Sequence, residues 1–180
     1  FLEKKLPEGL NLIVGALAIA PLARIIAIAV DPVVNSTLLN IGRMISAAAE
    51  QSPIIMGFLL GGIMKMICTS PLSSMALTAM LGLDGLAMGI AAIACVGGSF
   101  TNGIIFDRLK LGERSNVIAV MLEPLTQADI ITQNPIPIYG SNFFGGGLAG
   151  LAAAMLGIIN NAPGTASPIP GLLDPFGFNP

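Results

Sequence analysis

The stretch that most constrains the fold is Leu122 to Gly147, LEPLTQADIITQNPIPIYGSNFFGGG. It places polar side chains and two prolines, Pro135 and Pro137, inside an otherwise apolar chain. Each proline removes a backbone N–H and biases the preceding residue toward extended geometry, so we expect no regular helix through the middle. Broken backbone at membrane depth is tolerated only where it is buried in protein or lines a cavity. The stretch therefore predicts either a ligand-binding loop within the membrane or a loop outside it between two spans.

The composition favours an all-α protein that crosses a cell membrane several times. Of the 180 residues, 54% are hydrophobic and 10% are charged, and the mean hydropathy is +0.84. A soluble domain carries about 25% charged residues, which a water-facing surface requires. The net charge of -2 and the lack of basic residues interleaved with aromatic ones exclude a nucleic-acid partner.

Histidine is absent from the sequence, which narrows the chemistry available. A His phosphoacceptor and Ser-His-Asp catalysis are excluded within this stretch. A metal would need carboxylates or the two thiols, Cys68 and Cys95, and no ligand spacing is present. We therefore expect no metal and no cofactor, two cysteines that act as small buried apolar residues, and no evident catalytic residue.

Three apolar runs are candidates for membrane spans, over residues 10–30, 53–68 and 85–106. Asp31-Pro32 is expected to close the first run. A separate helix is predicted over Asn35–Glu50, with Ser36 and Thr37 capping its N-terminus, and it suits the membrane interface or ordinary packing equally. The spacing also predicts a short helix before the third span, with Leu81–Gly85 as the turn.

Polar groups and broken backbone coincide a second time in the hydroxyl-rich segment Thr69–Ser74. Its hydroxyls either contribute to a ligand site or cap the next helix. Gly145–Ile159 is predicted to be a Gly/Ala helix suited to burial between neighbours. Pro163–Pro180 contains too many prolines to cross as a helix, so it forms a re-entrant loop or a tail. The charged flanks leave the membrane orientation open.

Four segments, in order along the chain, carry a resemblance to a known family. They are Thr69–Met75 (TSPLSSM), Val96–Phe100 (VGGSF), Ile131–Ile138 (ITQNPIPI) and Ser167–Gly171 (SPIPG). They resemble the GPVNKAAY-like hairpin, the Gly/Pro-containing span, the GITEGAIPF-like signature and the PHGG-like loop of the membrane-embedded IIC component of the bacterial sugar phosphotransferase system, fructose-type branch. The strings LEPLTQADIIT and SNFFGGGLAG are also similar to IIC-like toxin regulators of the perfringolysin-regulator type.

The resemblance implies a polytopic membrane protein with broken helices and re-entrant hairpin loops. Residues 1–180 would then be part of a single IIC-like transmembrane domain, the C-terminal half of a longer chain. The implied partners are the lipid bilayer, a sugar or polyol, a IIB-like phosphocarrier and a second copy in a homodimer. Any phosphoryl transfer would be carried out by that carrier, and the enzyme class of this chain stays open.

Two departures from the family pattern shape the expected site. The signature carboxylate falls at Gln133, and the loop histidine falls within Ser167–Pro170, where no histidine occurs. Glutamine retains hydrogen bonding to a sugar hydroxyl but cannot act as a base, which favours a neutral ligand. The predicted ligand-binding residues are Ser73, Ser74, Glu123, Asp129, Thr132, Gln133, Asn134 and Asn142.

Three functions are compatible with these features. The first is a sugar or polyol permease component of the IIC type. The second is a membrane sensor or regulator that binds a ligand without transporting it, which the loss of the Glu and His equivalents favours. The third is a scaffold subunit whose polar loops lie in water.

Overall fold

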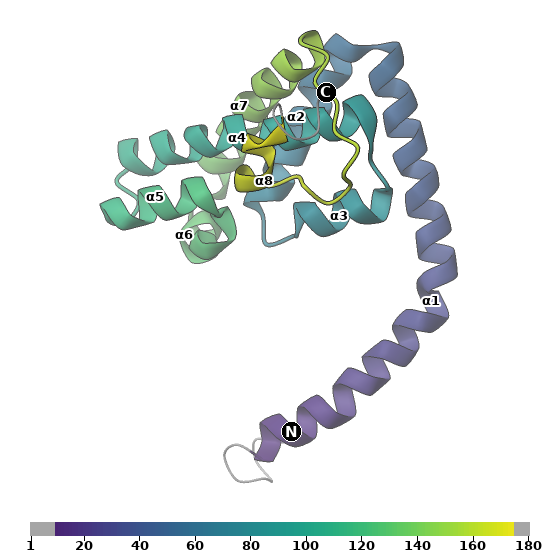
Figure 1. Cartoon of the computed structure of the whole chain (residues 1–180). Helices are drawn as coiled ribbons and strands as arrows, with labels where there is room; N and C mark the ends of the chain where they lie inside the picture. The colour runs from purple at the N-terminus through teal and green to yellow at the C-terminus, as the bar shows by residue number, and fades with distance from the viewer. Residues whose placement is uncertain (1–9, 175–180) are drawn as a thin grey trace. The chain divides into compact units, whose positions relative to one another are not determined.

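The computed structural model describes residues 10–174, with side chains at residue 17 and from residue 19 onward (Figure 1). This part of the chain contains no strand, which confirms the all-α prediction. Its elements are α1 (Leu10–Gln51), α2 (Pro53–Thr69), α3 (Ser74–Leu81), α4 (Gly85–Arg108), α5 (Arg114–Leu122), the 3-10 helix η2 (Pro124–Gln127), α6 (Ala128–Gln133), α7 (Pro135–Met155) and α8 (Pro168–Leu172).

The chain divides into two compact units, Phe1–Leu38 and Leu39–Pro180. The described part of the first unit is helical, and its apolar side chains from Leu17 to Val34 are mostly exposed. The functional pockets described below lie within the second unit.

Helix α1 is continuous through Pro32, so the prediction of two separate helices over 10–30 and 35–50 is wrong. Beyond Pro32, Ser36 and Thr37 do not cap a helix start. Their hydroxyls donate to the Val33 carbonyl over 3.1 and 2.8 Å, the pattern of serine and threonine within a helix. A proline within a helix removes only the hydrogen bond from its own nitrogen to the carbonyl four residues earlier, and the helix continues past it.

The prolines of the central stretch also have a different role from the predicted one. The helical path is broken at Glu123 and at Asn134, whereas Pro135 and Pro137 lie in the first turn of α7. Backbone N–H groups in the first turn of a helix have no intrahelical partner, so proline costs nothing there and its fixed φ favours helix initiation. The two prolines therefore begin a helix.

Helices α2 and α7 pack backbone against backbone at the centre of the second unit. A Cβ added at Gly61 would lie 2.6 Å from the Gly146 carbonyl oxygen, and one added at Gly150 would lie 2.4 Å from that of Gly57. Only glycine allows such an approach. The helices run antiparallel, because Gly57 faces Gly150 whereas Lys65, further along α2, faces Gly146. We call this contact the glycine seam.

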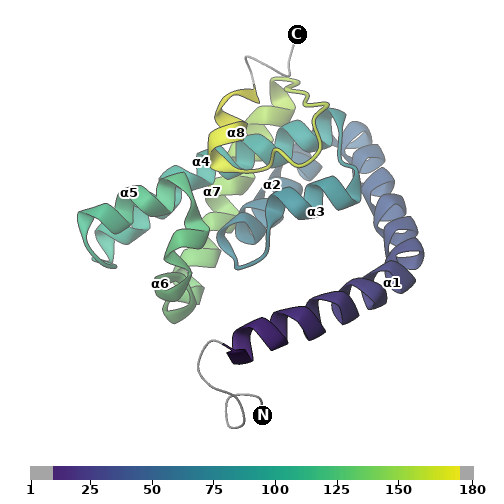
Figure 2. The same cartoon turned by 60° about the horizontal axis from the view of Figure 1, so that its bottom comes forward.

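Helix α4 completes the core by packing against both α2 and α7. A Cβ at Gly98 would lie 2.3 Å from Lys65 Cγ, and one at Gly97 would lie 2.4 Å from Ala149 Cβ. The short helix α8 lies against α4, as Figures 1 and 2 show, and Gly171 allows its close approach to the Ala92 carbonyl. The predicted short helix and turn are confirmed as α3 and Gly82–Asp84, and the segment predicted as the third span is helical, as α4.

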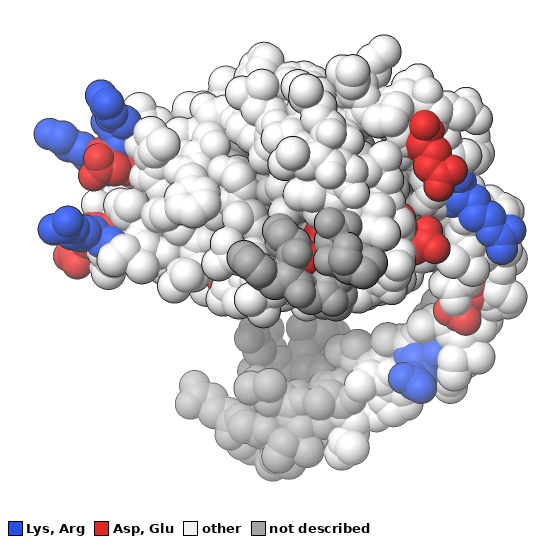
Figure 3. All heavy atoms as spheres, turned by 45° about the horizontal axis from the view of Figure 1, so that its top comes forward, with Lys and Arg blue, Asp and Glu red and all other residues white. Residues whose placement is uncertain are grey.

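Two described helical segments are long and apolar enough to cross a membrane, Ile19–Gln51 and Gly85–Arg108. The sequence has no charged residue between Asp84 and Asp107, and 24 helical residues extend about 36 Å, which exceeds the hydrocarbon thickness. Charged residues group at the two ends of α4. Figure 3 shows mostly uncharged surface between two such groups in the second unit, one of Arg43, Glu50 and Asp84 and one of Asp107, Lys110, Glu113 and Arg114.

Candidate functional site

Three segments that are distant in sequence meet around a cavity of about 230 Å³, which we call the polar pocket. It lies where the last turn of α2, the following turn, the α5–η2 junction and the start of α8 come together. Its lining residues are Cys68, Leu72, Ser73, Ser74, Met75, Glu123, Leu125 and Ser167.

Local hydrogen bonds fix the turn that supplies the serines. The Ser70 hydroxyl donates to the Ile67 carbonyl over 2.7 Å and accepts from the Leu72 N–H over 3.2 Å. The Ser73 hydroxyl accepts from the Ala76 N–H over 3.1 Å, so it caps α3. The capping alternative therefore holds for Ser73, and the same side chain also lines the polar pocket.

Ser74 joins this turn to the C-terminal part of the chain. Its hydroxyl donates to the Ala166 carbonyl over 2.6 Å, and the residue is 5% exposed. Because Ser167 follows Ala166 directly, this hydrogen bond places the Ser167 side chain at the pocket wall. The contact therefore holds two of the three pocket-forming segments together.

Glu123 supplies the only carboxylate among the lining residues. It ends α5 and precedes Pro124, with φ -149° and ψ 98°, an extended conformation that proline at the next position favours. Its own carbonyl accepts from the Thr126 hydroxyl over 2.8 Å, which fixes the backbone there. Glu123 itself is exposed, so its carboxylate is accessible to a ligand.

A wholly buried cation lies one helical turn before the pocket wall. Lys65 is 0% exposed, and its ammonium donates to the Cys95 carbonyl over 3.2 Å. Its methylene chain occupies the space left by Gly98 and Gly146. Cys68, three residues further along the same helix, lines the pocket. Desolvation of a charged side chain is costly, so a lysine buried in an apolar bundle is a candidate for a functional role.

Next to this lysine, three buried side chains form an amide chain across the core. The Asn142 amide donates to the Asn102 side-chain oxygen, and the Asn102 amide donates to the Thr69 hydroxyl over 3.3 Å. Asn142 also donates to the Ile138 carbonyl over 2.9 Å. The predicted site residue Asn142 thus connects α7 with α4 and α2 and does not line the polar pocket.

The structure brings together three of the predicted residues, Ser73, Ser74 and Glu123, at one pocket. The remaining four lie in or next to α6, away from that cavity. They are Asp129, Thr132 and Gln133, which are exposed, and Asn134, which is half-buried and donates to the Ile130 carbonyl over 3.1 Å. The Thr132 hydroxyl is engaged with the Asp129 carbonyl over 3.1 Å.

Sequence reasoning gave little weight to Lys65 and Cys68. A signal for Lys65 exists, because it is the single charged residue in the apolar run from Pro53 to Thr69. Its burial depends on Gly98 and Gly146, which belong to other helices, and no local pattern reveals that contact. Within residues 10–174, no cluster of three or more potential metal ligands occurs.

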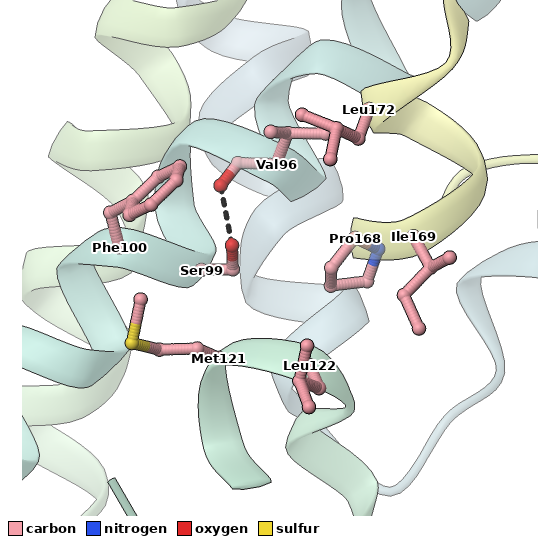
Figure 4. A pocket seen from close by; sticks show the side chains of 8 residues that line it. All are labelled: Val96, Ser99, Phe100, Met121, Leu122, Pro168, Ile169 and Leu172. Atoms are coloured by element: carbon pink, nitrogen blue, oxygen red, sulfur yellow. Dashed lines mark hydrogen bonds between the residues drawn. The ribbon is translucent and has the colours of Figure 1, made fainter. Parts of the chain in front are cut away.

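A second cavity, of about 160 Å³, lies between α4, α5 and α8 (Figure 4). We call it the apolar pocket. It is lined by Val96, Ser99, Phe100, Met121, Leu122, Pro168, Ile169 and Leu172. The one polar side chain among them, Ser99, donates its hydroxyl proton to the Val96 carbonyl over 2.6 Å. The wall therefore offers a ligand almost exclusively apolar contact.

Comparison with known proteins adds one positive finding. A family model described as "Phosphotransferase system, EIIC" matches residues 1–180. Searches of curated proteins and of solved structures find no match to the chain.

Proposed function

Because the chain belongs to the phosphotransferase system EIIC family, we propose that it is a permease component that binds a neutral sugar or polyol in the polar pocket. Members of this family are the membrane components of phosphotransferase transport systems. The observation that carries the proposal is the meeting of Ser74, Glu123 and Ser167 at one cavity. These residues come from three separate segments.

The pocket chemistry suits a hydroxyl-bearing ligand. The Glu123 carboxylate accepts hydrogen bonds from hydroxyl groups, and charge-assisted bonds of this kind are the stronger ones. The serine hydroxyls supply both donors and acceptors, whereas Cys68, Leu72 and Met75 supply apolar contact for the ring face. A ligand hydroxyl would attack the phosphorus of a phosphocysteine or phosphohistidine on a IIB-like partner. The bond from phosphorus to that side chain would break, the side chain would leave with the partner, and Glu123 would accept the hydroxyl proton or orient the hydroxyl.

The wider architecture is part of the proposal. We infer a multi-pass protein of the fructose-type branch, in which residues 1–180 belong to one IIC-like transmembrane domain with re-entrant loops and assemble as a homodimer. The uncharged length of α4 and the apolar helices α1 and α2 support it. Asp129, Thr132, Gln133, Asn134 and Asn142 remain predicted ligand residues, and movement of the α6 region toward the polar pocket would be required for the first four to contact a ligand there.

Equilibrium binding of radiolabelled hexoses and hexitols to the protein in lipid nanodiscs tests the proposal. We expect saturable binding of at least one of them. We expect Glu123→Gln to weaken it about tenfold, because a hydrogen bond to a charged group contributes roughly 1.5–3 kcal/mol. Glu50→Gln is the matched control, since Glu50 is an exposed glutamate outside the pocket and is not among the predicted ligand residues. Absence of binding across the panel, or equal effects of the two variants, would contradict the proposed site.

Two further measurements complete the test. Uptake of the bound sugar into proteoliposomes separates a permease from a sensor, because a sensor binds without flux. Gln133→Ala tests whether the segment Ile131–Ile138 contacts the ligand. A loss of affinity equal to that of Glu123→Gln would indicate that α6 forms part of the binding site.

A further inference from the structure

The two cysteines of the sequence lie at one contact between α2 and α4. Cys68 is in the last turn of α2 and is 5% exposed, whereas Cys95 is in the middle of α4 and is 0% exposed. Both are free thiols, and the Cys95 thiol donates a hydrogen bond to the sulfur of Cys68. Two sulfur atoms from different helices are therefore neighbours.

The two thiols differ in their access to the polar pocket. Cys68 lines that pocket, whereas Cys95 is not among the lining residues and is fully enclosed. A small solute in the polar pocket therefore reaches the sulfur of Cys68 and not that of Cys95. An accessible thiol next to a second, enclosed thiol is the arrangement of an attacking cysteine and a resolving cysteine.

The surrounding charges favour attack by Cys68. The Lys65 ammonium donates to the Cys95 carbonyl over 3.2 Å and interacts electrostatically with both thiols. A positive charge or a hydrogen-bond donor next to a cysteine stabilises the thiolate, which is the form that attacks an oxidant. Glu123 acts on both thiols in the opposite sense and more weakly than Lys65 does.

We propose that Cys68 and Cys95 are an oxidisable pair, which a hydroperoxide that enters the polar pocket converts to a disulfide between α2 and α4. The Cys68 sulfur attacks a peroxide oxygen. An S–O bond forms, the O–O bond breaks, and the other oxygen leaves with the thiol proton as water or an alcohol. The Cys95 sulfur then attacks the Cys68 sulfur. The S–S bond forms, the S–O bond breaks, and the hydroxyl leaves as water with the Cys95 proton.

The balance of this reaction is two electrons from the two thiols to one peroxide, and a dithiol reductant returns them. The inference does not depend on the proposed function, because it concerns the pocket wall and not the sugar. Hydrogen peroxide is small enough to enter a cavity of about 230 Å³ without any sugar being bound there.

The experiment treats the protein in lipid nanodiscs with hydrogen peroxide, denatures it, and counts the thiols that react with an alkylating reagent. Because the sequence has two cysteines, we expect the count to fall from two to none per chain. The intact mass should decrease by two hydrogen atoms, with no cross-link between chains, and a dithiol reductant should restore both thiols. Two reactive thiols after treatment, or a disulfide that joins two chains, would overturn the inference.

Two serine variants test the order of attack. In Cys95→Ser, Cys68 should stop at the sulfenic acid, which dimedone traps, whereas the parent protein should yield little of that adduct. In Cys68→Ser, the enclosed Cys95 should remain a thiol. Thermal unfolding of the reduced variants reports that they fold. Equal dimedone labelling of the parent protein and Cys95→Ser, or oxidation of Cys95 in Cys68→Ser, would overturn the assigned roles.

Discussion

The hydroxyl of Ser74 donates to the carbonyl of Ala166 over 2.6 Å, across 92 residues of sequence. This one hydrogen bond connects the turn after α2 with the segment that leads into α8. Both segments line the polar pocket, so the geometry of the candidate site depends on a long-range contact between a side chain and the main chain.

Replacement of Ser74 by alanine should therefore destabilise the protein. The buried Ala166 carbonyl would lose its partner, at a cost of about 1–3 kcal/mol. Ser141→Ala is the control, because the Ser141 hydroxyl is bonded to the Pro137 carbonyl of its own helix. Chemical denaturation in nanodiscs measures both variants, and equal stabilities would contradict the role assigned to Ser74.

The glycine seam predicts that replacing glycine by alanine lowers the stability of the protein at one position of α7 and raises it at another. A Cβ at Gly150 would lie 2.4 Å from the Gly57 carbonyl oxygen, so Gly150→Ala must separate α2 from α7 and should cost several kcal/mol. A Cβ at Gly140 meets nothing within 4 Å. Gly140→Ala should therefore stabilise the helix by about 0.5–1 kcal/mol. Thermal unfolding should shift down for the first variant and up for the second; two shifts of the same sign would argue against the seam.

Two substitutions of Lys65 separate the effect of its methylene chain on stability from the effect of its charge. Lys65→Met keeps the apolar length between Gly98 and Gly146 and removes an ammonium that is held by a single carbonyl. Its stability should equal or exceed that of the parent protein. Lys65→Ala should cost about 2–5 kcal/mol, because it leaves a cavity. If Lys65→Met is as unstable as Lys65→Ala, the charge itself stabilises the fold.

Asp174, outside the candidate membrane spans, predicts a pH dependence of stability. Burial raises the pKa of this carboxyl from 3.8 to about 6, and the Asn160 side chain offsets part of that rise. The folded state therefore binds a proton more tightly than the unfolded state does. Its contribution to stability is present below the unfolded pKa and is lost as pH rises through about 6. Asp174→Asn should flatten the stability profile between pH 4 and 7, and an unchanged profile would exclude this carboxyl as the cause.

The sequence was sufficient for the helical class and for the hydroxyl-rich turn before α3. These depend on composition and on short-range rules, such as serine before a helix. It was not sufficient for Pro32 and Pro135. Proline disfavours the middle of a helix and favours its first turn, and only the surrounding structure decides which applies.

The hydrogen bond between Ser74 and Ala166 and the burial of Lys65 could not be predicted from the neighbouring sequence for another reason. Both depend on contacts between segments far apart in the chain, and a hydroxyl or an ammonium has no pattern that names its distant partner. Asn142 illustrates the same limit. Its polarity within an otherwise apolar chain predicted a ligand contact, and nothing in the sequence indicated that its amide donates to the Asn102 side-chain oxygen.

The hydrogen bonds of Ser73 and Ser74 give these neighbouring serines opposite roles toward a guest molecule. Ser73 accepts from the Ala76 N–H, so its hydroxyl proton stays available. The Ser74 hydroxyl donates its proton to the Ala166 carbonyl, so the lone pairs of its oxygen stay available to a ligand donor. Two adjacent hydroxyls of a carbohydrate would thus be read in a fixed direction, one as acceptor and the next as donor. Such a polarity would set how the hydroxyls of a bound carbohydrate are turned in the cavity.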